Sequence, residues 1–244
     1  MKHPWVPFLA ATVVGLWPGA TLAYRPFDQT DADVAKQNEF QLELGPIAVQ
    51  HSPGGNALLP GVILNFGLVP RVEVVLEGDG LVVLGPLSQG TSRWQLDNSL
   101  LLKWVVREGV LQDAPGPSIA LEAGILFPSL PHNEGAGASL AAIVSERWSA
   151  ATVHLNVLVQ HTRDGWFDVV AGGIVEGPIR WTLRPVGEFF VDHSAAGTTA
   201  YSFLGGAIWR IQEALSVDAA VRVQPQQGGA ILEARLGLSW ALAL

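Results

Sequence analysis

The chain has 244 residues, of which 49% are hydrophobic and only 15% are charged, and it contains no cysteine. The absence of cysteine excludes disulfides and thiolate metal sites, and a formal net charge of −8 disfavours nucleic-acid binding, because no basic patch would meet the phosphates. Beyond the first 23 residues, no stretch offers the roughly 18 uninterrupted apolar residues that a membrane-spanning helix needs.

Residues 1–23 have the pattern of a cleaved secretory signal peptide. Lys2 and His3 give a weakly basic start, Trp5–Leu16 is apolar, and Thr21–Ala23 places small residues around a cleavage point. The alternative, an uncleaved membrane anchor, is disfavoured by the prolines within this short stretch. We therefore expect export and a mature chain that begins after residue 23.

Residues 24–38 are polar and acidic without periodicity, which predicts a periplasmic tail or a short plug. From residue 39 onward, apolar and polar residues alternate in twelve stretches separated by clusters of Gly, Pro, Asn and Ser, and such alternation is typical of β-strands. The strands are expected over residues 39–50, 58–66, 71–84, 94–107, 118–127, 138–144, 149–160, 166–175, 180–192, 200–210, 215–224 and 229–242.

The alternation fits either a soluble sandwich, with the apolar faces inward, or an outer-membrane barrel, with the apolar faces in lipid. Roughly 18 residues per strand and turn exceed the 8–12 of a compact sandwich and suit tilted membrane strands. Tryptophans fall near both sets of connections, which predicts two interfacial girdles, although core tryptophans of a soluble protein are the alternative. We predict an all-β, antiparallel, up-and-down transmembrane β-barrel of about 12 strands over residues 39–244.

The end of the chain supports the same interpretation. Large apolar residues alternate there with smaller or polar ones, namely Leu236, Leu238, Trp240, Leu242 and Leu244. An apolar final strand suits recognition by the barrel-assembly machinery. The expected location is the bacterial outer membrane, with both termini in the periplasm and outer-membrane lipid around the barrel.

Several short segments resemble a bacterial family of outer-membrane proteins. Arg25–Ala32 followed by Glu39–Gly45 is similar to the start of the family named for the meta-pathway of phenol degradation, whose members are called transporters. Further similarity runs through Asp97–Lys103, Pro117–Leu121 and Glu188. The resemblance implies a β-barrel with a transport role, and it supplies no catalytic or binding residues.

The polar faces of the predicted strands are rich in charge, with more acids than bases. Two interpretations stay open, a charged pore that favours cations and a salt-bridged lumen that fills the barrel and conducts little. The lumen-lining candidates are Glu43, Glu73, Glu77, Lys103, Arg107, Glu122, His154, Arg184, Glu188, Arg210, Asp218, Arg222, Glu233 and Arg235. Further carboxylates on these faces are Asp79, Asp97, Asp168 and Asp192.

Counting outward from three turns brings opposite charges into register on the polar face. Lys103 should lie opposite Glu122, and Arg210 opposite Asp218. The third expected pair is Arg222 with Glu233. Directly opposed charges stabilise a strand pair modestly and help to specify its register.

No constellation of catalytic or metal-binding residues stands out. Loop histidines (His51, His132, His161 and His193), with Glu134, Asp164 and Asp192, could hold a transition metal, but without a ligand spacing we expect ordinary exposed residues and no metal or cofactor. His154 could join a hydrolase constellation, yet no serine or acid partner is identifiable, since Ser118, Ser139 and Ser202 occupy ordinary strand positions.

The sequence therefore predicts a channel or transporter for passive passage of small solutes, hydrophobic ones included, rather than an enzyme. Two alternatives come from other classes. One is a sealed barrel with a structural or adhesion role, and the other is a barrel enzyme that modifies lipids.

Overall fold

The computed structural model describes residues 26–86, 93–131, 135–226 and 228–243. The predicted signal peptide lies outside these residues, as do His132 and Glu134. Twelve strands form in the described part: β1 (Glu39–Ser52), β2 (Gly55–Val69), β3 (Val72–Leu84), β4 (Trp94–Arg107), β5 (Ser118–Leu126), β6 (Gly137–Arg147), β7 (Thr152–His161), β8 (Phe167–Glu176), β9 (Leu183–Ser194), β10 (Thr199–Gln212), β11 (Leu215–Gln226) and β12 (Gly229–Ala243).

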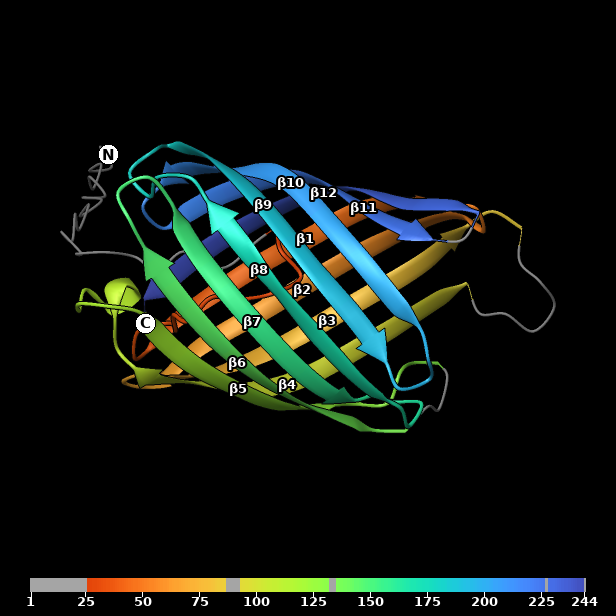
Figure 1. The fold of residues 1–244 in the computed structure, drawn as a ribbon, viewed down its shortest axis with the longest axis horizontal. Coiled ribbons are helices and arrows are strands. Elements are labelled where there is room, and N and C mark those ends of the chain that lie inside the picture. The colour runs from red at the N-terminus through yellow and green to blue at the C-terminus, as the bar shows by residue number, and fades with distance from the viewer. Residues whose placement is uncertain (1–25, 87–92, 132–134, 227, 244) are drawn as a thin grey trace, which may run out of the picture.

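The strands close into a single antiparallel barrel, as predicted. Each strand pairs with its neighbours in the chain, and β1 also pairs with β12, so that no sheet edge is left open. Figure 1 shows the strands tilted against the long axis of the molecule. Because Glu39 pairs with Ala243, the start of β1 and the end of β12 lie at one end of the barrel. We call this the terminal end; the even-numbered connections lie there too.

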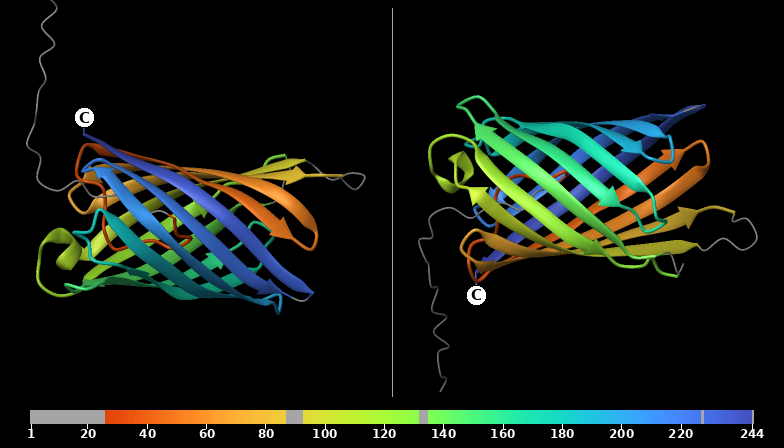
Figure 2. Two further views of the ribbon diagram at one scale, coloured as in Figure 1. Left: turned by 90° about the horizontal axis from the view of Figure 1, so that it is seen from above. Right: turned by 60° about the horizontal axis from the view of Figure 1, so that its bottom comes forward.

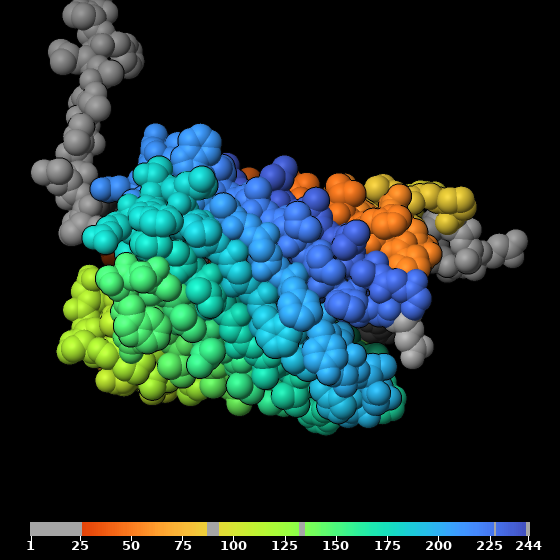
Figure 3. All heavy atoms as spheres, turned by 45° about the horizontal axis from the view of Figure 1, so that its top comes forward, coloured from red at the N-terminus to blue at the C-terminus, as the bar shows by residue number. Residues whose placement is uncertain are grey.

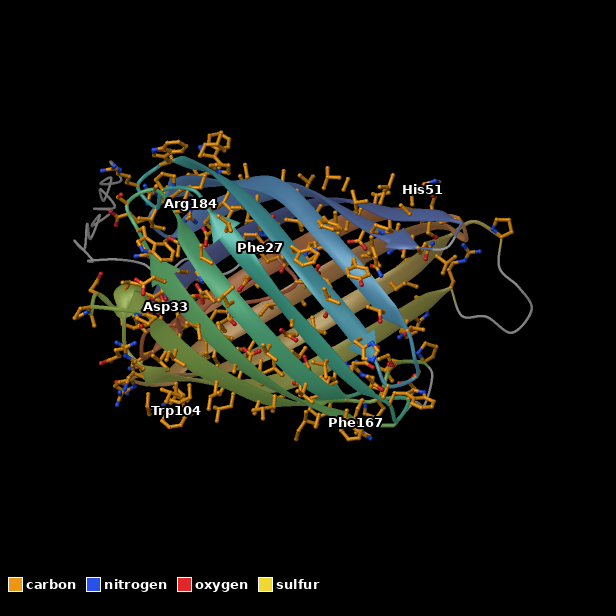
Figure 4. All side chains as sticks on the ribbon, in the orientation of Figure 1. Phe27, Asp33, His51, Trp104, Phe167 and Arg184 are labelled. Carbon is orange, nitrogen blue, oxygen red and sulfur yellow. The ribbon has the colours of Figure 1, made fainter. Side chains whose placement is uncertain are left out.

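The side chains of each strand alternate between a polar interior and an apolar exterior. Glu43 and Lys103 are both 3% exposed, whereas Leu102 is 49% and Leu183 59% exposed. Figure 3 shows one outer face, on which the side chains of neighbouring strands lie against one another, and Figure 4 shows side chains projecting outward from the wall. This distribution is the reverse of a soluble sandwich and is that of a transmembrane barrel.

Every tryptophan among the described residues is exposed on the outer wall, between 44% and 58%. Trp94 and Trp166 lie toward the end opposite the terminal end. Toward the terminal end lie Trp104, which points outward in Figure 4, and also Trp148, Trp181, Trp209 and Trp240. Among the described residues there is no helix long and apolar enough to cross a membrane.

Two of the three predicted charge pairs are in register. Lys103 lies opposite Glu122, and Arg222 lies opposite Glu233. The prediction for Arg210 is wrong. At the turn Gln212 faces Leu215, which would already place Arg210 opposite Val217, and a register shift between Arg210 and Gln212 moves it one residue further, opposite Ser216.

Candidate functional site: a lumen cavity beside an internal segment

Residues 26–38 enter the barrel before β1 begins, and Figure 2 shows this segment, in red, within the ring of strands. Two apolar contacts hold it. Phe27, labelled in Figure 4, packs in a buried cluster on β8–β11, and Ala32, fully buried, packs against β5 and β6. The cluster around Phe27 comprises Ile174, Val186, Leu204, Ile208 and Ala220, and the one around Ala32 comprises Ala120, Ala141 and Ile143.

Charged side chains of the inner wall bind the first part of the segment. The Glu188 carboxylate accepts hydrogen bonds from the backbone N–H of Asp28 at 3.1 Å and of Gln29 at 2.9 Å. Arg235 donates to the Pro26 carbonyl oxygen at 3.1 Å and to Asp28 Oδ1 at 2.9 Å. An irregular backbone inside the barrel thus has its polar groups satisfied by the wall.

The middle of the segment is bound in the same way. Lys103 Nζ lies 3.0 Å from Thr30 Oγ1 and 3.4 Å from Asp31 Oδ1. Ser145 Oγ accepts the Ala32 N–H at 2.9 Å. These partners come from β4 and β6, so the segment crosses the lumen from the β12 side.

The last part returns to the wall where a glycine permits close approach. Glu73 Oε2 accepts the Ala35 N–H at 2.7 Å. A Cβ at Gly67 of β2 would lie 1.9 Å from the Lys36 carbonyl oxygen, so a larger residue there would displace the segment. The backbone of Asn38 then donates to the Gly67 carbonyl oxygen, immediately before β1.

A cavity of about 420 Å³ lies between the segment and the inner wall. This volume falls within the range of small-molecule sites. Nine carboxylates and two cationic side chains contribute to its lining: Asp28, Asp31, Asp33, Glu43, Glu73, Glu77, Glu122, Asp168 and Asp192 against Lys103 and Arg222. Acidic side chains therefore outnumber basic ones in the cavity lining.

The two cations are already engaged by some of these acids. Lys103 Nζ lies 3.6 Å from Glu73 Oε1, and Arg222 Nη1 lies 3.5 Å from both Asp28 Oδ2 and Glu233 Oε2. In the described part of the chain, Glu122, Asp168 and Asp192 form neither an ion pair within 4.0 Å nor a side-chain hydrogen bond. These three cavity acids thus have neither a hydrogen-bond donor nor a close cation among the described side chains.

One side of the cavity is apolar. Val170 of β8 and Phe190 of β9 lie beside the acids, and Leu158 of β7 adjoins them. The Arg222 guanidinium carbon lies 5.4 Å from the centroid of the Phe190 ring, a distance at which a cation is attracted to the ring face. Charge and apolar surface therefore meet in one cavity.

The surroundings of Asp33, an acid of the segment, alter its protonation. Burial raises the pKa of its carboxyl from 3.8 to about 7, and the neighbouring Asp31 carboxylate acts in the same direction. A hydrogen bond from Gln112 at 3.0 Å and the charge of Lys103 oppose this shift of the pKa. The docked segment thus favours protonated Asp33.

The structure places the lumen candidates in three groups. Those that line the cavity are Glu43, Glu73, Glu77, Lys103, Glu122 and Arg222. Others are buried inside the barrel outside the cavity lining, namely His154, Arg184, Glu188, Asp218, Glu233 and Arg235. The remaining two candidates, Arg210 and Arg107, lie toward the terminal end. Arg210 donates to the Ile179 carbonyl oxygen. Arg107 is exposed at the end of β4, and its Nη2 atom lies 2.8 Å from the position that a Cβ on Gly116 would occupy.

His154 has two partners that the sequence analysis missed. Its Nδ1 lies 2.7 Å from Ser145 Oγ and its Nε2 lies 3.2 Å from Glu176 Oε1, while Arg184 Nη1 lies 3.0 Å from Glu176 Oε2. Ser145 is opposite His154 on the neighbouring strand. We predicted β6 to end at residue 144 and placed Glu176 in a turn, so neither residue had been assigned a face.

The three histidines expected in loops that fall in the described part lie instead near the ends of strands, His51 on β1, His161 on β7 and His193 on β9, and they have ordinary partners. His51 Nδ1 lies 2.7 Å from Asn56 Oδ1, His193 Nδ1 lies 2.9 Å from Thr199 Oγ1, and His161 contacts the edge of Phe167. Among the described residues, no group of three or more His, Asp or Glu side chains could hold a metal ion.

Comparisons with known proteins define the class of fold. No family model matches the chain, and no curated protein matches it. Among solved structures, the KdgM porin bound to disordered oligogalacturonate superposes with a TM-score of 0.58 at 7% identity, covering 83% of this chain and 98% of that one. The COG4313 outer membrane channel from Pseudomonas putida F1 superposes with a TM-score of 0.55 at 12% identity, covering 89% and 100%. The chain therefore has the fold of an outer-membrane β-barrel.

Proposed function

We propose that this protein is an outer-membrane channel for the passive passage of small solutes and that its lumen favours cations. The observation that carries the proposal is the acid-rich cavity inside a closed barrel whose outer wall is apolar. A water-filled passage lined by excess carboxylates concentrates cations and repels anions. The similarity in fold to the KdgM porin and to the COG4313 outer membrane channel supports the proposal of a channel. The resemblance to the family named for the meta-pathway of phenol degradation supports it as well.

The internal segment has a part in this proposal as a plug that narrows the passage. Its contacts with Glu188, Lys103, Ser145 and Glu73 span the lumen from one wall to the other. The same contacts favour the second candidate, a sealed barrel with a structural role. Flux distinguishes the two candidates, because a sealed barrel passes nothing.

The third candidate, a lipid-modifying enzyme, has little support at His154. Ser145 is fully buried, His154 is 1% exposed, and the Ala32 N–H occupies the serine oxygen. A nucleophile that substrate cannot reach has no catalytic role, and these residues instead form a chain of hydrogen bonds that ends on the segment. We therefore propose a protein without enzymatic activity.

Liposome flux tests the proposed function. Full-length protein reconstituted into vesicles should admit a small cationic solute faster than a neutral solute of the same size, and an anionic one slowest. Vesicles without protein and vesicles with heat-unfolded protein are the controls. Impermeable vesicles would favour the sealed barrel, and release of fatty acid from the vesicle lipid would favour the enzyme.

A further inference from the structure

Two strands bring unpaired acids and an aromatic ring together on one side of the cavity. Asp168 and Val170 point inward from β8, and Phe190 and Asp192 point inward from β9. Asp192 lies opposite Val170, which makes Asp168 and Asp192 diagonal neighbours on the same face. Diagonal neighbours on one face lie about 7–8 Å apart, so the two carboxylates flank one space.

Among the residues that the structure describes, no side chain supplies a counter-ion for this space. Neither Asp168 nor Asp192 has an ion pair or a side-chain hydrogen bond in the described part, and the Oδ1 atom of each is buried without a partner. His193, next to Asp192 in the chain, is exposed, and its Nδ1 lies 2.9 Å from Thr199 Oγ1. Asp168 and Asp192 are each partly buried. Holding two like charges side by side without compensation is unfavourable, so the arrangement gains free energy from a cation that enters.

The wall next to these acids suits the apolar part of a ligand. Gly172 lies opposite Phe190, and a Cβ at Gly172 would lie 2.5 Å from Phe190 Cβ, so the glycine permits the close approach of β9 that positions Phe190. Arg222 already places its guanidinium over this ring at 5.4 Å, which shows that the ring accepts a cation. A hydrated inorganic ion would gain nothing from Val170 and Phe190, whereas an organic cation would cover them.

We propose that this part of the cavity, formed by Asp168, Val170, Phe190 and Asp192, is a binding site for small organic cations. The ammonium group lies between the two aspartates and the apolar body lies against Val170 and Phe190. The inference rests on the proposed channel function, because the channel gives the ligand its route to the cavity. It adds the class of solute that the passage selects.

Isothermal titration calorimetry on the full chain in non-ionic detergent tests the site with three probes of one shape. We expect 2-phenylethylammonium to bind at least 10-fold tighter than the neutral 2-phenylethanol, and 3-phenylpropanoate not to bind. Raising the salt from about 0.05 M to about 0.5 M should weaken amine binding severalfold, since screening lengths shrink accordingly. Equal affinity for the amine and the alcohol would overturn the proposal without any variant.

A pair of matched variants locates the site. D168N/D192N removes two charges from the cavity and should weaken amine binding at least 10-fold, and F190L should weaken it severalfold. E108Q/D113N removes two exposed charges outside the cavity lining and should bind like the wild type. Wild-type affinity in D168N/D192N would refute the site; heat-modifiable migration on gels reports whether each variant is folded.

Conductance of the same preparation separates this inference from the proposed function. Conducting protein that does not bind the amine contradicts the binding site and leaves the channel standing. Protein that binds the amine at the aspartates but never conducts contradicts the channel and leaves the site standing.

Discussion

Replacing Lys103 by Met should destabilise the barrel far more than the loss of an ordinary ion pair. Lys103 is 3% exposed, and its Nζ lies 3.6 Å from Glu73 Oε1 and 3.4 Å from Asp31 Oδ1, with Glu122 opposite on β5. Removing the cation leaves three acids around one buried point, and breaking a buried pair from one side costs about 3–5 kcal/mol. The double variant K103M/E73Q removes one of the stranded acids and should recover about 1–2 kcal/mol.

Arg71 provides the control, because it forms an ion pair with Glu108 at a similar distance of 3.8 Å on the surface. The side chains of Arg71 and Glu108 are about half exposed, at 50% and 52%, so R71M should change the free energy of unfolding by less than about 1 kcal/mol. Urea unfolding of vesicle-inserted protein, followed by the fluorescence of the exposed tryptophans, measures all three variants. If K103M unfolds within about 1 kcal/mol of the wild type, the interior around Lys103 is hydrated and the reasoning is wrong.

Three further predictions follow from the wall and the segment. L102R and V157R place a charge on the exterior, where Leu102 is 49% and Val157 50% exposed, and each should cost about 2–4 kcal/mol in vesicles; a cost near zero would mean that this wall does not face lipid. S145A leaves the Ala32 N–H without its acceptor and should reduce the free energy of docking of the segment by about 1–3 kcal/mol. Limited proteolysis within residues 26–38 should then be faster. The control variant S52A, in an exposed hairpin, should be cleaved at the wild-type rate. Docking raises the pKa of Asp33 from 3.8 to about 7, so the docked segment is most stable at low pH and loses stability as the pH rises through that window. Proteolysis of the segment should therefore accelerate from about pH 5 to about pH 8. D33N should remove the part of this pH dependence that comes from Asp33.

The period-two pattern was enough to predict the strands and their faces. Leu102 and Lys103 are adjacent in sequence, yet one is 49% and the other 3% exposed, as the alternation requires. The low content of charge and the spacing of the strands then distinguished a membrane barrel from a sandwich. A register could be predicted where the pairing has no shift, as for Arg222 with Glu233.

Counting residues outward from a turn did not predict the pairing where the backbone is irregular. The turn before β11 pairs Gln212 with Leu215, one residue away from the predicted register, and the register shift after Arg210 adds another, so Asp218 lies opposite Ile208 instead. The partners of His154 were missed for a related reason, because β6 continues to Arg147, three residues beyond the predicted end.

The course of the internal segment could not be predicted from the sequence. Residues 26–38 have no periodicity, and their position depends on contacts between distant parts of the chain, such as Gln29 with Glu188 and Ala32 with Ser145, which are 159 and 113 residues apart. The cavity depends on that position, since the segment forms one of its walls. The excess of acids on the inner face could be predicted from the sequence. The identity of the acids without a partner could not, because it depends on where Lys103, Arg222 and Arg235 bind the segment.

The reversal potential of single channels across a potassium chloride gradient tests the central claim most directly. With nine carboxylates and two cationic side chains at the cavity, the potential should shift toward that of a cation-selective pore, and D168N/D192N should reduce the shift. Anion selectivity, or the absence of conductance from folded protein in the bilayer, would contradict the account.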